Sequence, residues 1–175
     1  MKKLVFYCCN LVFFSGAMYL FGKYDVISYP VMFASTIGLF FLYLVRLTTK
    51  QQRLLHSRFK RIDVMSGEEF EEYLRLQFKR KGYAVETTPT TGDFGADLLL
   101  RYRKQETIVQ AKRYRQSVGI QAVQEVLGAK QYYGVDNGMV VTNSFFTKAA
   151  KELALASEIE LWDRDKIEEE FNIRP

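Results

Sequence analysis

Two short apolar segments constrain the fold of this chain more than any other feature. Residues 92–100 run from a glycine-rich turn into three leucines, and residues 108–114 alternate between apolar and polar side chains. Both segments read as β-strands, and the connection between them is short enough for a hairpin. Side chains two residues apart on a strand share a face, so Gln110 and Lys112 point the same way. A hairpin places Asp97 beside this pair.

An acid, an amide and an amine on adjoining strands form an unusual group for a sheet. Charged groups are costly to bury without partners, so a chemical role is the better explanation. Metal-assisted phosphodiester hydrolysis suits these residues, because Mg²⁺ prefers oxygen ligands such as the Asp97 carboxylate and an oxygen from the Gln110 region. The Lys112 ammonium would orient or activate the attacking water and offset charge in the transition state.

Four segments of the chain also carry a family resemblance. They are residues 92–97, 109–114, 122–126 and 141–147. In this order they resemble the catalytic domain of Mrr-type restriction endonucleases, a branch of the PD-(D/E)XK nuclease superfamily. The resemblance runs from about Ser66 to Phe171. It implies an α/β fold with an αβββαβ core and a mixed sheet, dependence on Mg²⁺ or Mn²⁺, and DNA as the substrate.

The resemblance also assigns roles to individual residues. Asp97 matches the metal-binding acid, Gln110 the (D/E) position and Lys112 the catalytic lysine. Glutamine is usual in this branch, although it departs from the superfamily's acidic pattern and removes one negative charge from the metal site. The backbone carbonyl of Ala111 is a further candidate ligand. Glu71 either adds a metal ligand, as the matching helix glutamate does in the family, or is an acid favoured in a first helical turn.

Asp93 and Gln124 are additional candidates with two interpretations each. Asp93 either belongs to the turn beside Gly92, which we favour, or is a second acid near the metal. Gln124 and Glu125 are expected to lie near the top of the sheet. There they contact substrate, order Lys112 or, as we slightly favour, serve the fold alone.

Charge is unevenly distributed along the chain. Residues 75–115 carry ten basic and four acidic groups, whereas residues 116–175 carry six basic and ten acidic groups. This asymmetry is consistent with a positive face for a polyanion, and equally with solvated surface lysines. Arg113 and Arg115 are the candidate contacts to nucleic acid. The single histidine, His56, argues against histidine-based nuclease, zinc and serine-hydrolase sites.

Helices and strands alternate around the predicted hairpin. Ser66 and Glu69 have the form of a capping box, and Phe70, Leu74 and Phe78 recur at the spacing of a buried helix face. The expected elements are a helix at 66–81, a strand at 83–88, a helix at 116–133 with Ile120, Val123 and Leu127 buried, a strand at 138–142, a helix at 146–157 capped by residues 142–144, a strand at 160–162, and a last helix that Asp163 caps and that ends at Phe171.

The first 45 residues contain two long stretches without charge. Residues 4–22 and 26–45 each approach the roughly 20 apolar residues that cross a hydrocarbon core of ~30 Å. They predict a transmembrane helical hairpin, with a cleaved signal peptide as the rival interpretation of the first stretch. Lys2 and Lys3 precede the hairpin and six basic residues lie in 46–61. The positive-inside rule therefore places both termini in the cytoplasm, at the inner membrane.

The expected organisation is a hairpin at 1–45, a basic linker at 46–61 and an endonuclease domain at 62–175. The linker is either a helical continuation or a coil on anionic headgroups, and we prefer lipid to DNA as its partner. The predicted function is a membrane-anchored, metal-dependent DNA endonuclease with a restriction or defence role. The alternative is an inactive, membrane-tethered nucleic-acid-binding or assembly module on the same fold. DNA, membrane lipid and a second copy of the chain are the candidate partners.

Overall fold

The computed structural model describes residues 28–55, 59–88 and 95–173. The chain divides into two units, Met1–Thr48 and Thr49–Pro175. In the first unit, the described residues belong to the long helix α2, Ser28–Leu55. Large apolar side chains are exposed along this helix; they include Ile37, Leu39, Phe40, Phe41 and Leu42.

The predicted membrane hairpin falls mostly on this first unit. The stretch 4–22 lies outside the described residues, and the stretch 26–45 overlaps α2. Among residues 28–55, 59–88 and 95–173, no helix combines the length and the apolar character that crossing a membrane requires. The predicted linker at 46–61 is helical as far as Leu55, and the boundary between the two units lies within it.

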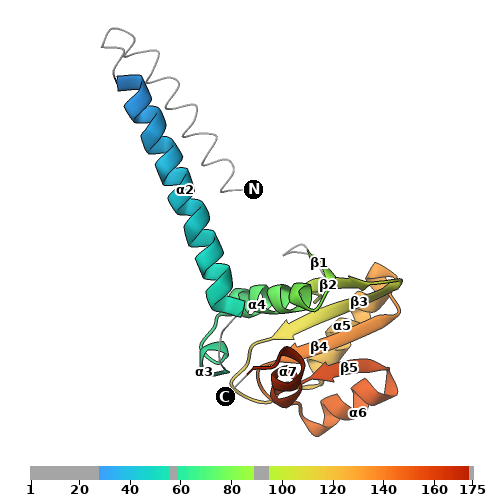
Figure 1. The fold of residues 1–175 in the computed structure, drawn as a ribbon. Coiled ribbons are helices and arrows are strands. Elements are labelled where there is room, and N and C mark those ends of the chain that lie inside the picture. The colour runs from blue at the N-terminus through green and yellow to red at the C-terminus, as the bar shows by residue number, and fades with distance from the viewer. Residues whose placement is uncertain (1–27, 56–58, 89–94, 174–175) are drawn as a thin grey trace. The chain divides into compact units, whose positions relative to one another are not determined.

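Within its described residues, the second unit is built on one mixed sheet of five strands (Figure 1). The strands lie side by side in chain order: β1 (Ala84–Thr87), β2 (Leu98–Tyr102), β3 (Gln105–Lys112), β4 (Asn137–Thr142) and β5 (Ile159–Trp162). The first three strands pair antiparallel, and β3, β4 and β5 pair parallel. The predicted hairpin joins β2 to β3 through Arg103 and Lys104, with Arg103 in the left-handed region at a φ of 55°.

In the described part of this unit, the helices that accompany the sheet are α3 (Phe59–Ile62), α4 (Gly67–Arg80), α5 (Ile120–Tyr133), α6 (Lys148–Ala156) and α7 (Arg164–Phe171). The order from α4 through β1, β2, β3 and α5 to β4 is the αβββαβ core that the sequence predicts. Two apolar cores show which helices cover which face. Leu98, Leu100 and Val109 pack with α4 and α7, whereas Leu99 and Ile108 pack with α5 and α6.

Helix α4 forms as its sequence predicts. The Ser66 side chain accepts a hydrogen bond from the Glu69 N–H at 3.1 Å, and Glu69 Oε2 accepts one from the Ser66 N–H at 3.2 Å, which completes the capping box. Phe70, Leu74 and Phe78 are fully buried. Each such side chain contributes roughly 1.5–3 kcal/mol to the free energy of folding. The helix is therefore anchored by its apolar face and begins at a defined residue.

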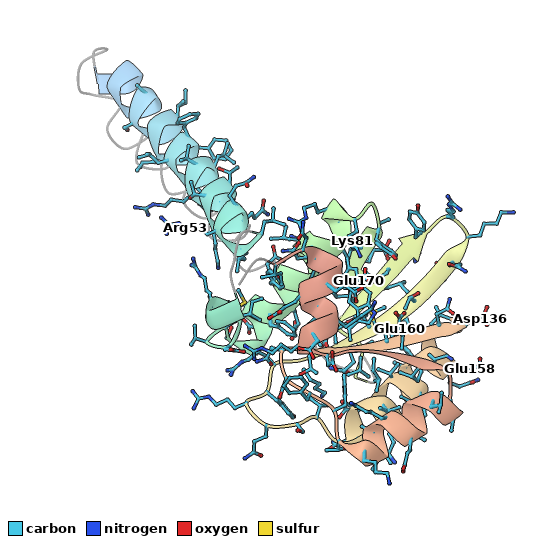
Figure 2. All side chains as sticks on the ribbon, turned by 60° about the horizontal axis from the view of Figure 1, so that its bottom comes forward. Arg53, Lys81, Asp136, Glu158, Glu160 and Glu170 are labelled. Carbon is cyan, nitrogen blue, oxygen red and sulfur yellow. The ribbon has the colours of Figure 1, made fainter. Side chains whose placement is uncertain are left out.

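The last helix, α7, closes the same face of the sheet against the end of α4. Asp163 caps it, as predicted, by accepting a hydrogen bond from the Lys166 N–H at 3.1 Å. Figure 2 shows Lys81 and Glu170 close together where the two helices meet, and the two side chains form an ion pair. The Lys81 ammonium also lies 5.4 Å from the centre of the Trp162 ring. These contacts join the C-terminal helix to the start of the domain.

Two predicted helix starts are wrong. Helix α5 begins at Ile120 instead of Gln116, and α6 begins at Lys148 with Thr147 as its cap instead of residues 142–144. The reason is an isolated parallel bridge between Val118 and Phe146. The Val118 N–H donates to the Phe145 carbonyl at 2.8 Å, and the Thr147 N–H donates to the Val118 carbonyl at 3.0 Å. Both segments therefore stay extended before their helices begin.

The predicted buried face of α5 is also partly wrong. Val123 is buried as expected, but Ile120 is 40% exposed and Leu127 is only partly buried. The residues that face the core are Ala122, Val123, Val126 and Ala129. Two alanines on this face let the helix lie close to the sheet, so packing rather than the largest apolar side chains sets its rotation.

Candidate active site

The candidate site lies where β2 begins and β3 ends. Leu98 pairs with Val109 and Leu99 with Ile108, so the same register places Asp97 opposite Gln110. Asp97 was predicted to lie within the strand, but β2 starts one residue later, at Leu98. The Asp97 N–H nevertheless donates to the Val109 carbonyl at 2.9 Å. Asp97 is thus held as an extension of the sheet.

The Asp97 carboxylate is fixed by two donors from β3. Gln110 Nε2 donates to Asp97 Oδ2 at 2.7 Å, and the backbone N–H of Ala111 donates to the same oxygen at 2.6 Å. Hydrogen bonds to a charged acceptor are about twice as strong as neutral ones. Asp97 and Gln110, predicted to be neighbours, are therefore brought together in a defined geometry.

Lys112 shares this face of the sheet but is engaged by a helix. Its Nζ lies 2.6 Å from Glu125 Oε2, and the two side chains are only 19% and 27% exposed. Glu125 belongs to α5, and its other oxygen accepts a hydrogen bond from Gln121 Nε2 at 3.2 Å. The structure therefore brings Glu125 into contact with Lys112; from the sequence, substrate contact, ordering of Lys112 and a purely structural role were all open for Glu125.

The conformation of Gly95 explains how α5 comes so close to the β2–β3 pair. Its φ is +86°, a conformation that favours glycine. A Cβ built at this position would lie 2.7 Å from Glu125 Cβ and 2.9 Å from Gln110 Oε1. Gly95 therefore provides the space in which the β2–β3 pair and α5 meet.

The side-chain amide of Gln110 is buried, and its oxygen accepts no hydrogen bond from the described residues. Gln110 is 4% exposed, and its Oε1 has no hydrogen-bond partner within the described part of the chain. A buried acceptor in this state costs about 1–3 kcal/mol. Beside the Asp97 carboxylate, this amide oxygen is a ready ligand for a hard cation. Considering only residues 28–55, 59–88 and 95–173, no group of three or more His, Cys, Asp or Glu comes together.

The other sequence-predicted residues are placed as follows. Glu71 is partly buried on α4, the helix that covers the opposite face from Gln110 and Lys112, and its role as a ligand stays a prediction. Asp93 lies outside the described residues. Gln124 is exposed on α5. The carbonyl of Ala111 as a ligand stays a prediction as well.

Arg113 and Arg115 follow β3 directly. Arg113 is partly buried, with an Nε that has no hydrogen-bond partner among the residues that the structure describes, and Arg115 is exposed. This segment is tied down at Tyr114, whose N–H donates to Asn143 Oδ1 at 2.8 Å. The two arginines therefore leave the sheet from the same end as the catalytic candidates. Their contact with DNA stays a prediction.

A polar network beside this segment was missed by sequence reasoning. Arg164 donates from Nη2 to Asp63 Oδ2 at 2.5 Å and from Nη1 to Asp63 Oδ1 at 3.1 Å. Asn143 Nδ2 donates to Asp63 Oδ1 at 3.0 Å. Partial burial raises the pKa of Asp63, but hydrogen bonds from Arg164 and Asn143 and the charges of Arg164 and Arg113 outweigh it and hold the pKa below its ordinary value.

The network has a weak signal in the sequence. Polar residues directly after a buried strand, here residues 142–144, mark the carboxyl end of a parallel sheet. We expected them to cap the next helix, and the sequence does not identify Asp63 or Arg164 as their partners. Asn143 instead connects the segment after β3 to Asp63, so the network supports the loop that carries Arg113 and Arg115.

Comparisons with known proteins identify a family and similar folds. The model of the Mrr_cat family, described as restriction endonuclease, matches residues 62–171. The fold is similar to that of the DNA modification-dependent restriction endonuclease AspBHI, with a TM-score of 0.52 and 18% identity over 68% of this chain and 34% of that one. No curated protein matches the chain significantly.

Two further solved structures are similar at lower scores. The MspJI restriction endonuclease in complex with a 27-mer oligonucleotide has a TM-score of 0.42 and 20% identity over 56% of this chain and 26% of that one. AF1548, a protein of unknown function, has a TM-score of 0.47 and 14% identity over 54% of this chain and 56% of that one. The chain thus spans between 26% and 56% of the length of these three structures.

Proposed function

Because the chain belongs to the Mrr_cat family of restriction endonucleases, we propose that its second unit hydrolyses DNA phosphodiester bonds with the help of a divalent cation. The observation that carries the proposal is that Asp97, Gln110 and Lys112 lie on one face of the sheet, where Asp97 is hydrogen-bonded to Gln110 and Lys112 is paired with Glu125. An acid, an amide and an amine on the same face can provide the three functions that this hydrolysis needs: cation binding, orientation and charge neutralisation.

The residues at this point fit a hard divalent cation. Asp97 would hold it through the carboxylate, and Gln110 through the amide oxygen that has no partner among the described residues. The carbonyl of Ala111 is the third proposed ligand. Oxygen donors of this kind suit Mg²⁺ or Mn²⁺. When bound, the cation would act as a Lewis acid on the phosphate and lower the pKa of water.

The protein's own residues supply the remaining parts of the mechanism. The Lys112 ammonium orients the attacking water and stabilises the negative charge that grows on the phosphate oxygens. The β2–β3 pair holds Asp97 beside Gln110 before the substrate binds. Arg113 and Arg115 would contact phosphates next to the cleaved bond.

A plasmid assay tests the proposal. The full-length chain is incubated with supercoiled plasmid and Mg²⁺ or Mn²⁺, and the nicked and linear forms are measured over time. We expect nicking that EDTA stops. DNA retention without nicking in either metal would reject hydrolysis and favour the alternative, a nucleic-acid-binding module on the same fold. Absence of both would reject a role with DNA.

We also propose that residues 1–45 attach the chain to the inner membrane, with both termini in the cytoplasm. Support comes from the two charge-free stretches at 4–22 and 26–45 and from the basic residues on either side of them. Fractionation tests this attachment: the full chain should stay with membranes after carbonate extraction, and a chain that begins at residue 46 should not. Release of the full chain by carbonate would overturn the proposal.

A further inference from the structure

We propose that Glu125 is a positioning residue for the catalytic lysine, Lys112. The functional residues of the site are then Asp97, Gln110, Lys112 and Glu125. The inference rests on the proposed nuclease function and extends it to a residue outside the strand pair. Glu125 comes from α5, the helix that packs on the same face of the sheet as Leu99 and Ile108. Gln110 and Lys112 alternate onto this same face.

The first argument is the ion pair itself. Lys112 Nζ and Glu125 Oε2 are 2.6 Å apart, and each side chain is more than two-thirds buried. A mostly buried ammonium needs a counter-ion to stay charged, and removing one partner of such a pair is costly. A lysine side chain has a flexible four-carbon stem, so an unpaired Lys112 would sample several rotamers. Glu125 restricts it to one.

The second argument is that Glu125 is itself held in place. Gln121, one turn earlier on α5, donates to its Oε1 at 3.2 Å. On its other side, the backbone of Gly95 comes so close that a Cβ there would lie 2.7 Å from Glu125 Cβ and 3.2 Å from Glu125 Cγ. A carboxylate that is oriented from two sides can orient a partner in turn.

The third argument is the charge of the group. Gln110 is neutral where the superfamily pattern has an acid. Counting one negative charge each for Asp97 and Glu125 and one positive charge for Lys112 gives a net charge of −1. An acid at position 110 without Glu125 would give the same sum. Glu125 therefore supplies the acidic neighbour of Lys112 that Gln110 does not provide.

Cleavage kinetics with two variants of the full chain test the inference. Glu125→Gln keeps the shape and removes the charge, so we expect kcat to fall ~10- to 100-fold, as when a supporting group of an active residue is lost. KM and the Kd for DNA should stay near those of the wild type. Glu125→Asp keeps the charge on a shorter side chain and should recover part of the rate.

Glu152→Gln is the matched control. It removes the same charge from an exposed ion pair between Glu152 and Lys148, 3.6 Å apart on α6, and should leave kcat unchanged. A Glu125→Gln protein that cleaves at the wild-type kcat would overturn the inference. A loss that is confined to KM, or that follows the melting temperature across all three variants, would overturn it as well.

A spectroscopic measurement separates this inference from the nuclease proposal. In ¹⁵N-lysine-labelled protein without metal or DNA, the ammonium signal of Lys112, assigned with Lys112→Arg, should report an ordered group in the wild type and an averaged one in Glu125→Gln. An unchanged signal would reject the positioning role whatever the activity. A wild-type chain that cannot cut plasmid would reject the nuclease proposal independently of this signal.

Discussion

The side-chain amide of Gln110 donates a hydrogen bond to the carboxylate of Asp97 across 2.7 Å. An acid at position 110 would instead face Asp97 with like charge. The amide therefore holds the carboxylate in place in the metal-free protein and leaves its own oxygen, Oε1, buried beside it. At position 110, glutamine therefore favours the stability of the metal-free protein, whereas an acid would favour affinity for the metal.

Replacing Gln110 with Glu should expose this opposition. The metal-free Gln110→Glu protein loses a hydrogen bond to a charged group, worth about 1.5–3 kcal/mol, and gains like-charge repulsion, so its melting temperature should fall. Mg²⁺ should raise its melting temperature more than that of the wild type, because two carboxylates bind the cation more tightly. Thermal unfolding across a Mg²⁺ titration measures both effects, and an equal response to Mg²⁺ would contradict the assignment of Gln110 as a ligand.

Removing the side-chain amine of Lys112 should distinguish DNA binding from DNA cleavage. In Lys112→Ala we expect plasmid nicking to fall by ~10²–10⁴-fold or more, since the group that stabilises developing charge is absent. DNA retention in a gel-shift assay and the circular dichroism spectrum should stay close to those of the wild type. Lys148→Ala, on the exposed surface of α6, is the control. Cleavage by Lys112→Ala at the wild-type rate would reject the catalytic role.

The close approach of Gly95 to α5 predicts opposite effects on stability for alanine substitutions at Gly95 and at Gly128. Gly95→Ala forces a Cβ into a backbone with φ of +86° and to within 2.7 Å of Glu125 Cβ. We expect a loss of roughly 1–3 kcal/mol in the free energy of unfolding, together with reduced cleavage. Gly128→Ala meets nothing within 4 Å on α5, and should instead stabilise the helix by up to about 1 kcal/mol. Urea unfolding of both proteins checks the contrast, which equal effects would contradict.

The ion pair between Asp63 and Arg164 predicts a dependence of stability on acid. The folded-state pKa of Asp63 lies below its ordinary value, so the unfolded chain takes up a proton first as the pH falls. The stability that this carboxylate contributes is complete above the ordinary value, about pH 4, and is lost as the pH falls through the lowered folded-state pKa.

Asp63→Asn tests this prediction. The variant should unfold more easily than the wild type at pH 7, and the difference should shrink as the pH falls below about 4. Asp136→Asn makes the same change at an exposed position before β4, which is labelled in Figure 2, and serves as the control. A difference from wild type that is constant between pH 7 and pH 3 would show that the charge of Asp63 does not act on stability.

The sequence by itself determined the features that depend on a few neighbouring residues. The capping box at Ser66, the buried face of α4, the β2–β3 hairpin and the shared face of Gln110 and Lys112 all follow from hydrogen bonds and periodicities within a dozen residues. Such patterns are local, so they can be read before the chain is folded. The αβββαβ core, in contrast, was implied by the resemblance to the Mrr-type catalytic domain.

Only the tertiary structure decided which partners these groups have. Asp63 and Arg164 are 101 residues apart in the chain, and the bridge between Val118 and Phe146 moves the starts of two helices. Helical periodicity also predicted the buried face of α5 partly wrongly, because Ala122 and Ala129 face the sheet where larger side chains were expected. The rotation of α5 turns Glu125 toward Lys112. Helix packing depends on the shapes of both surfaces at once, and one segment of sequence contains only one of them.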